Sequence, residues 1–179
     1  MRPILSDILT FGQHLNTLKE SPDLYRPKFC PYCHAVVIWC HGFYYRKPDR
    51  INHGNDSVND IPIPRHQCAD CRHTFSTLPE CIAPRRWYPW AIQQWCLWLS
   101  LNGWSVRQIH QCFPISRSTI KRWINWLLDY FALHHHEICN QLPEMGYFAN
   151  CAPFWNHWLK SRLFSHAMVL LNKGGLVVP

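Results

Sequence analysis

The sequence predicts an α+β fold in which a small β module is followed by an α-helical module and a C-terminal helix. Three observations lead to this prediction. Two Cys-x-x-Cys pairs flank segments of strand-like composition, a stretch with helical periodicity follows them, and an apolar segment with helical spacing comes near the end. With 179 residues, 47% hydrophobic and 15% aromatic, the chain is long enough for two small modules with their own cores.

We expect four segments along the chain. They are an N-terminal helix with its lead-in at 1–28, a β module at 29–80, a helical module with an extended third helix at 81–142, and a C-terminal helical tail at 143–179. The first helix is expected over residues 6–19, with Ser6 as its cap and Leu9, Leu15 and Leu18 on its apolar side. We interpret it as a packing helix, and the alternative is a helix that binds a partner.

Two cysteine pairs, Cys30-Pro31-Tyr32-Cys33 and Cys68-Ala69-Asp70-Cys71, carry the strongest functional signal. In this spacing both sulfurs lie on one side of a turn, at the separation that Zn²⁺ needs. Because four thiolates fill a tetrahedral shell and leave no position for water, the sequence predicts one structural zinc ion. Its expected ligands are Cys30, Cys33, Cys68 and Cys71. The alternative is a pair of redox dithiols, or unrelated buried thiols.

The insert between the two pairs has the composition of a β-sheet. Residues 35–39 are apolar and β-branched, Gly42 allows a turn, and residues 43–46 can return as a second strand. Residues 61–68 lead into the second cysteine pair, and residues 74–78 add a last strand. This outline is a zinc ribbon, in which two turns at the ends of hairpins are clamped by a metal.

Residues 47–60 are rich in turn-forming side chains, and we expect them to form a hairpin excursion. The remaining cysteines lack metal-binding spacing and are interpreted as small buried hydrophobes or free thiols. They are Cys40, Cys81, Cys96, Cys112, Cys139 and Cys151. Cys40, His34, His41 and His73 lie close enough in sequence to the pairs to substitute as ligands.

Charge is distributed unevenly along the chain, whose net charge is +7. Residues 81–128 contain no Asp or Glu. The basic residues of this stretch are Arg85, Arg86, Arg107, Arg117, Lys121 and Arg122. Such a surface attracts polyanions, and the alternative is a solvated basic face without a partner. We expect Arg85 and Arg86, which follow Pro84, to grip DNA phosphates or to reach into a minor groove.

The same acid-free stretch predicts helices. The first is expected over residues 90–101, with an apolar stripe of Trp95, Trp98 and Leu99, and Asn102-Gly103 ends it.

The second helix begins after Ser105, which can cap it, and continues through Val106, Ile109 and Phe113 at helical spacing. Pro114 ends this helix.

A third helix, capped by Ser116, has one apolar and one basic side. Its apolar residues are Ile120, Trp123, Ile124, Leu127, Leu128 and Phe131, and its opposite side carries Arg117, Ser118, Lys121, Arg122 and Asn125. A short turn between the second and third helices predicts a helix-turn-helix, whose last helix enters the DNA major groove. Arg117, Ser118 and Lys121 are the expected base readers, whereas Arg122 and Asn125 suit either bases or backbone. The alternative is an ordinary amphipathic helix packed in a bundle.

Five motifs occur in order along the chain. They are Cys30-Pro31-x-Cys33, His41-Gly42-x-Tyr44-x-Arg46, Arg65-x-x-Cys68-x-x-Cys71-x-x-Thr74-Phe75, Gly103-x-Ser105-x-Arg107-x-Ile109 and Ser116-x-x-Thr119-Ile120-x-Arg122-Trp123. Together they resemble the N-terminal half of bacterial insertion-sequence transposases, over residues 29–128. The resemblance implies binding to double-stranded DNA at the ends of the element, a separate catalytic transposase subunit as partner, and repression of transcription. The sequence departs from the pattern of that family in two ways. His34 stands where glycine is usual, and the segment between the two cysteine pairs is longer than usual.

We expect no enzymatic activity of the chain's own. A full transposase would continue into a ribonuclease-H-like core whose carboxylates clamp metal ions, but only Asp129, Glu137 and Glu144 follow residue 128. The alternatives to an insertion-sequence protein are a chromosomal transcription regulator, a zinc-ribbon adaptor between proteins, and a truncated transposase relic.

The C-terminal tail gives weaker signals. The His134-His135-His136 run is interpreted as a solvated end of the third helix, and the alternative is adventitious metal binding. Residues 153–172 are expected to form one helix, either a lid on the core or a contact in a homodimer. Asp7 interrupts the one candidate signal peptide, and no stretch reaches the roughly 18 apolar residues of a membrane helix. We therefore expect a cytoplasmic protein without a membrane partner, in which reduced cysteines favour metal over disulfides.

Overall fold

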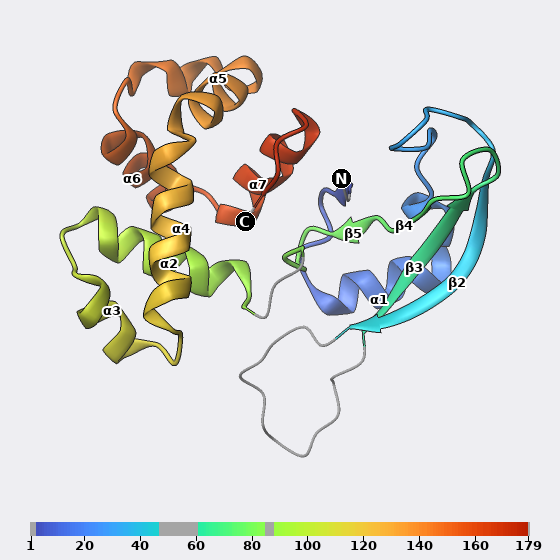
Figure 1. The fold of residues 1–179 in the computed structure, drawn as a ribbon, viewed down its shortest axis with the longest axis horizontal. Helices are drawn as coiled ribbons and strands as arrows, with labels where there is room; N and C mark the ends of the chain where they lie inside the picture. The colour runs from blue at the N-terminus through green and yellow to red at the C-terminus, as the bar shows by residue number, and fades with distance from the viewer. Residues whose placement is uncertain (1–2, 47–60, 85–87, 179) are drawn as a thin grey trace. The chain divides into compact units, whose positions relative to one another are not determined.

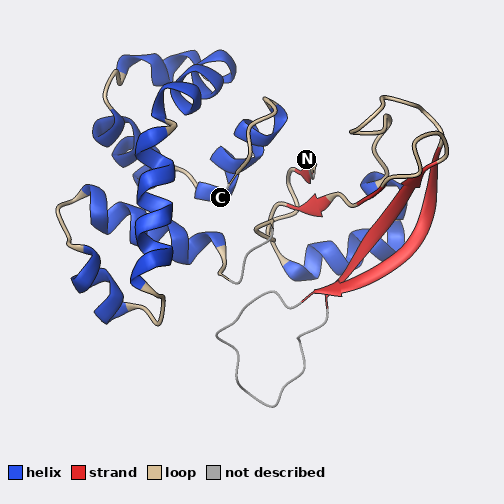
Figure 2. Cartoon of the chain, viewed as in Figure 1, coloured by secondary structure: helices blue, strands red, loops and turns tan. Residues whose placement is uncertain are grey.

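Helices and two small sheets make up the computed structural model of the protein, which describes residues 3–46, 61–84 and 88–178 (Figures 1 and 2). The predicted α+β class is confirmed. The described part of the chain contains seven α-helices, a three-stranded antiparallel sheet and a two-stranded parallel sheet. The expected excursion at 47–60, and Arg85 and Arg86, lie outside the described residues.

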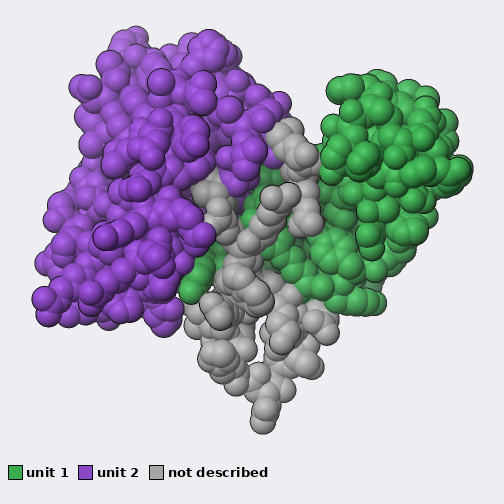
Figure 3. Space-filling model, viewed as in Figure 1, with its two compact units in different colours: residues 1–89 green, residues 90–179 purple. Residues whose placement is uncertain are grey.

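The chain divides into two compact units, residues 1–89 and 90–179 (Figure 3). The first unit holds both sheets, whereas the second is built from helices. Residues 81–89, which the sequence placed with the helical module, belong to the first unit. No helix among the described residues is both long and apolar enough to cross a membrane.

The larger sheet has the strand order β2 (Ile38–Arg46), β3 (Ile61–Cys68) and β4 (Thr74–Phe75). The sequence predicted two strands separated by a turn at Gly42, and this is wrong, because β2 runs through that position as one strand. The pairing register shifts between Cys40 and Phe43, and Gly42 has a φ of 76°. Glycine adopts this conformation without steric cost. The strand therefore continues through Gly42 with one extra residue, as a β-bulge. The sheet and the two cysteine turns are called the ribbon below.

The expected last strand at 74–78 is divided. Residues 74–75 form β4 on the edge of the ribbon, whereas β5 (Leu78–Pro79) pairs in parallel with β1 (Ile4–Leu5). Leu78 is fully buried there, beside Ile61 and Ile63 of β3. A second small core thus lies at the end of the ribbon remote from the cysteines.

Helix α1 (Phe11–Glu20) begins later than predicted. Its cap is Thr10 and not Ser6, because the Thr10 hydroxyl accepts a hydrogen bond from the backbone N–H of Gln13, while the Gln13 side chain accepts from the Thr10 N–H. This reciprocal pair is a capping box, which satisfies two backbone donors at the start of the helix.

The buried side of α1 centres on His14, whereas the predicted apolar residues Leu9 and Leu15 are exposed. The His14 Nε2 lies 2.9 Å from the Pro62 carbonyl of β3, and its Nδ1 lies 2.6 Å from the Tyr25 hydroxyl in the 3-10 helix η1 (Pro22–Tyr25). Burial lowers the pKa of His14. A neutral imidazole therefore donates to Pro62, accepts from Tyr25 and joins three elements of the first unit.

The second unit begins with α2 (Trp90–Leu101), whose bounds agree with the prediction. Its predicted apolar stripe is wrong, since the buried side carries Cys96 and Leu97, and Trp95 is 55% exposed. A helix with apolar residues on all sides gives no clear periodicity, so its contacts decide which side is buried.

Helix α3 (Val106–Cys112) is capped by Ser105, and α4 (Arg117–Asp129) by Ser116, as predicted. The predicted extended third helix is wrong. At Tyr130 the backbone leaves the helical conformation, with φ −103° and ψ 14°, and α5 (Phe131–Gln141) starts after it. Phe131 therefore belongs to α5, and the exposed Leu128 does not join the buried side of α4.

Beyond α5, the chain forms the 3-10 helix η2 (Pro143–Tyr147) and two α-helices, α6 (Cys151–Ser161) and α7 (Phe164–Lys173). The expected single helix at 153–172 is wrong, because Arg162 and Leu163 are extended. The indole N–H of Trp158 donates to the Leu163 carbonyl at 3.1 Å and holds this break. Helix α7 packs against α2 and α5, and most of its residues are buried.

The predicted solvated end of the third helix is wrong for His134, which is 2% exposed within α5, whereas His136 of the same run is exposed. The His134 ring lies 4.2 Å from the Trp126 ring and 5.8 Å from the Trp155 ring, between centroids, and its Nδ1 has no hydrogen-bond partner among the described residues. Burial lowers the pKa of His134 to about 4.

Acid is therefore expected to destabilise the second unit through His134. The His134 ring takes up a proton near pH 6.5 in the unfolded chain and near pH 4 in the folded chain. The stability that comes from burying the neutral ring is therefore fully present above pH 6.5 and is lost on acidification towards pH 4. The loss is on the order of 3 kcal/mol. Urea unfolding followed by helical circular dichroism at pH 7.5 and 5 should show a smaller loss in His134→Leu. Equal losses in both proteins would contradict this role.

Candidate metal centre and nucleic-acid interface

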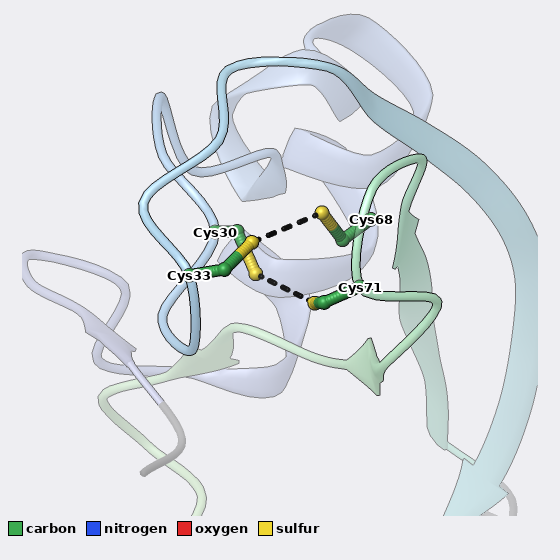
Figure 4. A group of neighbouring side chains, drawn as sticks. All are labelled: Cys30, Cys33, Cys68 and Cys71. Atoms are coloured by element: carbon green, nitrogen blue, oxygen red, sulfur yellow. Dashed lines mark hydrogen bonds between the residues drawn. The ribbon is translucent and has the colours of Figure 1, made fainter.

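Four cysteine side chains from two turns of the ribbon point towards one another (Figure 4). Cys30 and Cys33 precede β2, whereas Cys68 ends β3 and Cys71 lies in the turn before β4. The Sγ atoms of Cys30 and Cys71 are 3.6 Å apart, as are those of Cys33 and Cys68. All four Sγ atoms lie within 4.8 Å of one another. The cysteines that the sequence singled out therefore form one cluster that can hold a metal ion.

The two turns repeat the same backbone geometry. The residue after each pair has a left-handed conformation, with φ 62° at His34 and 61° at Arg72. The Cys30 N–H donates to the Ala35 carbonyl, and the Cys68 N–H donates to the His73 carbonyl. A non-glycine residue adopts positive φ only where its surroundings impose it. The repetition indicates that both turns are shaped to present their sulfurs to one point.

The sulfur positions fit a tetrahedral metal and do not fit disulfides. A Zn–S bond of about 2.3 Å places the sulfurs of a tetrahedral site about 3.8 Å apart. The observed separations of 3.6 Å are close to that value and far longer than a disulfide bond of about 2.05 Å. The residues present therefore fit a closed structural site that leaves no position for water.

The thiols of the cluster ionise unequally. Desolvation opposes ionisation of Cys30, but hydrogen bonds from the backbone of Cys33 and Tyr32 and from neighbouring thiols lower its pKa to about 7. For Cys71, a backbone hydrogen bond from His73 lowers the pKa, but desolvation and the neighbouring thiols raise it to about 12. Four thiolates in such proximity repel one another, and a bound cation would offset this repulsion.

Among the described residues, these four cysteines form the one group of His, Cys, Asp or Glu side chains whose ligand atoms lie close enough together to hold a metal ion. Of the alternative ligands, Cys40 and His41 are exposed on β2, and His73 stacks on the Tyr32 ring at 4.6 Å between centroids. Cys96 is fully buried, as expected of a small hydrophobe, and burial raises its pKa to about 12. Cys112, by contrast, is exposed.

In the second unit, α2 packs against both α3 and α4, and a short turn at 113–116 joins α3 to α4. Ile115 in this turn is fully buried, and its carbonyl lies 2.7 Å from the His110 Nδ1. On α4, Ile120, Trp123 and Leu127 face the core. This arrangement is a helix-turn-helix.

The basic side of α4 is open to solvent. Six residues of the second unit were predicted to contact DNA, and all six are exposed. They are Arg107 on α3 and Arg117, Ser118, Lys121, Arg122 and Asn125 on α4. Ser116 Oγ accepts from the Thr119 N–H at 3.2 Å and so caps the helix at the end where Arg117 and Ser118 lie. The helix contains no acid before Asp129. These side chains can approach a polyanion without a competing carboxylate on their own helix.

Sequence reasoning missed an aromatic and basic group beside the cysteine cluster. The Arg72 guanidinium lies over the Trp39 ring, 5.4 Å from its centroid, and the adjacent His73 stacks on Tyr32. The sequence does contain a signal for this group, because the basic residues Arg72 and His73 directly follow the second cysteine pair and the aromatic Trp39 lies in a predicted strand.

Comparison with known proteins gives one family. No curated protein and no solved structure matches the chain significantly. A family model described as "Domain of unknown function (DUF6431)" matches residues 30–123, from the first cysteine of the cluster to the middle of α4. The matched segment therefore includes the cysteine cluster, α3 and the first half of α4. On this match, which covers more than half of the chain, the protein belongs to the DUF6431 family.

Proposed function

We propose that the protein is a sequence-specific DNA-binding protein of an insertion sequence, in which one structural zinc ion holds the ribbon and α4 reads double-stranded DNA. The observation that carries the proposal is the exposed basic side of α4 within a helix-turn-helix. Arg117, Lys121 and Arg122 lie on this side, opposite the buried Ile120 and Trp123.

Zinc is the metal that suits the cluster best. Its ligands are four sulfurs within 4.8 Å of one another, two pairs of which are 3.6 Å apart, and soft thiolates select Zn²⁺ over the hard cations Mg²⁺ and Ca²⁺. Four thiolates would fill the coordination shell of the zinc ion and leave no open position for water or a substrate. A zinc ion there would therefore brace the two turns and would not take part in catalysis.

The dimensions and chemistry of α4 support docking in the major groove. An α-helix with its side chains is about 10–12 Å wide, which the major groove of about 12 Å admits. The N-terminal turn of α4 exposes Arg117 and Ser118, and Lys121 follows one turn later. Arginine can pair with guanine through two hydrogen bonds, whereas lysine and serine can hold phosphates. Arg107 on α3 adds a further cation for the backbone.

The link to an insertion sequence rests on the ordered motifs that resemble the transposase N-terminal half. The matched family segment supports treating the ribbon and the helix-turn-helix as one functional unit, because it begins at the first cysteine of the cluster and extends into α4. On this proposal, the chain binds the ends of the element and a separate subunit supplies the catalytic carboxylates. A chromosomal regulator would differ in the DNA site that it selects.

The proposal is tested by selecting binding sites from a pool of random DNA duplexes and measuring affinity for the selected site. The double variant Arg117→Gln/Lys121→Gln should bind that site at least about tenfold more weakly, because it loses two of the cations that the proposal places against the DNA. It should also lose preference at one base position. Lys160→Gln/Lys173→Gln removes two exposed charges from α6 and α7, and is expected to bind like the wild type.

Two outcomes would contradict the proposal. One is selection that yields no enriched sequence. The other is equal weakening in both double variants, which would indicate general electrostatic attraction. Retained binding to a protein partner in Arg117→Gln/Lys121→Gln, with no DNA binding by the wild type, would favour the adaptor alternative.

A further inference from the structure

The two faces of the ribbon sheet differ at the end that carries the cysteines. One face is a small core, in which Ile38, Cys68 and Phe75 are buried together with Cys30. Cross-strand partners point to the same face, and successive residues along a strand alternate between faces. Trp39, next to the buried Ile38, therefore lies on the opposite face, and it is 48% exposed.

A row of side chains crosses the three strands on this open face. Trp39 of β2 pairs in register with Gln67 of β3, which pairs in turn with Thr74 of β4. Arg65, two residues before Gln67, shares the face, and its guanidinium donates to the Thr74 hydroxyl at 3.1 Å. Arg72 reaches over the Trp39 ring from the second cysteine turn. We call Trp39, Arg65, Gln67, Arg72 and Thr74 the ribbon face.

The cations of the ribbon face are held by neutral groups. Arg65 contacts a hydroxyl and Arg72 contacts an indole. The salt bridges within the described residues are Arg26–Asp23 and Arg162–Glu144, so neither arginine is paired with a carboxylate there. Asp70 is the acid nearest to Arg72 in sequence, and it is exposed. The guanidinium that lies over the half-exposed indole and a second one on the same face therefore remain able to bind anions.

The chemistry of this face matches single-stranded nucleic acid. Unpaired bases stack on exposed aromatic rings, and arginines beside the ring bind the phosphates between successive bases. A guanidinium lying over a ring extends the stack, since its planar face can also receive a base. The adjacent His73–Tyr32 stack, 4.6 Å between centroids with both rings exposed, supplies a second aromatic surface from the same turn. A base-paired duplex buries the faces of its bases, so it cannot use such a ring without unstacking.

We propose that the ribbon face binds unpaired bases of single-stranded DNA, with Trp39 as the stacking platform and Arg65 and Arg72 as the phosphate contacts. This surface lies on a different unit from α4, so the chain carries separate surfaces for duplex and for unpaired DNA. The inference shares with the proposed function the premise that the protein binds DNA, but it depends on other residues.

The test measures binding of the metal-loaded full chain to a fluorescent 12-nucleotide oligothymidine at several salt concentrations. Trp39→Ala should weaken binding at least about fivefold and leave the salt dependence unchanged, because stacking involves no counterion release. Arg65→Gln and Arg72→Gln should each lower the slope of log K against log salt by about 0.7, the value for one phosphate of a single strand.

Matched controls lie on the same unit. Tyr45→Ala removes an aromatic side chain that is 67% exposed on the opposite face of β2, and Lys19→Gln removes an exposed charge from α1. Both should bind the oligonucleotide like the wild type. Metal content equal to that of the wild type shows that a variant retains the ribbon fold, and the two arginine variants carry the test if Trp39→Ala loses its metal.

The outcomes separate this inference from the proposed function. Arg117→Gln/Lys121→Gln should lose duplex binding and keep oligothymidine binding, and Trp39→Ala should show the reverse. Unchanged oligothymidine binding in Trp39→Ala and in both arginine variants would contradict the proposal that the ribbon face binds single-stranded DNA, but it would not affect the proposal that α4 binds the duplex. Equal losses in Tyr45→Ala and Trp39→Ala would also overturn it.

Discussion

Chelation of the metal is expected to unfold the cysteine end of the ribbon while the second unit keeps its helices. The apolar core at that end consists of Cys30, Ile38, Cys68 and Phe75, with Ala35 and Cys71 packed against it. So few buried side chains cannot offset the conformational entropy of two ordered turns. Structural zinc supplies about 10–16 kcal/mol in small domains of this kind, so its removal is the largest single effect expected in this protein.

The measurement is hydrogen exchange of the backbone amides before and after chelation. The Cys30 and Cys68 amides, which donate within the two turns, should lose protection, whereas amides of α4 and α7 should keep theirs. Cys30→Ser/Cys68→Ser should reproduce the loss and bind no zinc, and Cys40→Ser/Cys112→Ser, which alters two exposed thiols, should behave like the wild type. Protein that is purified without chelator, contains no metal and keeps both turns protected would refute the structural site.

Substitution of Trp123 by alanine is expected to destabilise the second unit by about 3–5 kcal/mol. The side chain is 1% exposed at the centre of the buried side of α4, and a cavity of that size cannot be filled by its neighbours. Since a domain is stable by only about 5–15 kcal/mol, much of the unit should unfold. The neighbouring Arg122→Ala lies on the exposed side and should change stability by less than about 0.5 kcal/mol.

Chemical denaturation followed by helical circular dichroism compares these two variants directly. Trp123→Ala should shift the midpoint strongly, whereas Arg122→Ala should shift it little and reduce DNA affinity instead. Similar midpoints for both variants would show that α4 does not have the buried and exposed sides on which the proposed function depends.

Elements whose limits are set by local signals were predictable from sequence. Ser105 and Ser116 each accept from the backbone N–H three residues ahead, and Gly103, with φ 88°, follows the end of α2. The cysteine cluster was predictable for the same reason, because each pair is a local turn whose two sulfurs suit one metal.

Apart from the cap of α1, where the local Thr10–Gln13 capping box was overlooked in favour of Ser6, the features that sequence reasoning missed depend on contacts between distant residues. Gly42 suits a turn and a bulge equally, and only pairing with β3 decides for the bulge. The helical pattern continues across Tyr130, so the break between α4 and α5 has no sequence signal of its own. His134 looks like a polar helix end until Trp126 and Trp155 are seen around it. An apolar helix such as α7 suits a partner surface or a core, and its packing against α2 and α5 places it in the core.

Binding to the selected DNA duplex as a function of salt concentration tests the central claim most directly. Each phosphate neutralised by a cation of the helix-turn-helix contributes about −0.9 to the slope of log K against log salt. With Arg107, Arg117, Lys121 and Arg122 exposed on α3 and α4, we predict a slope steeper than about −2.5. A binding constant that stays the same between low and high salt would contradict the assignment of this protein as a DNA-binding protein.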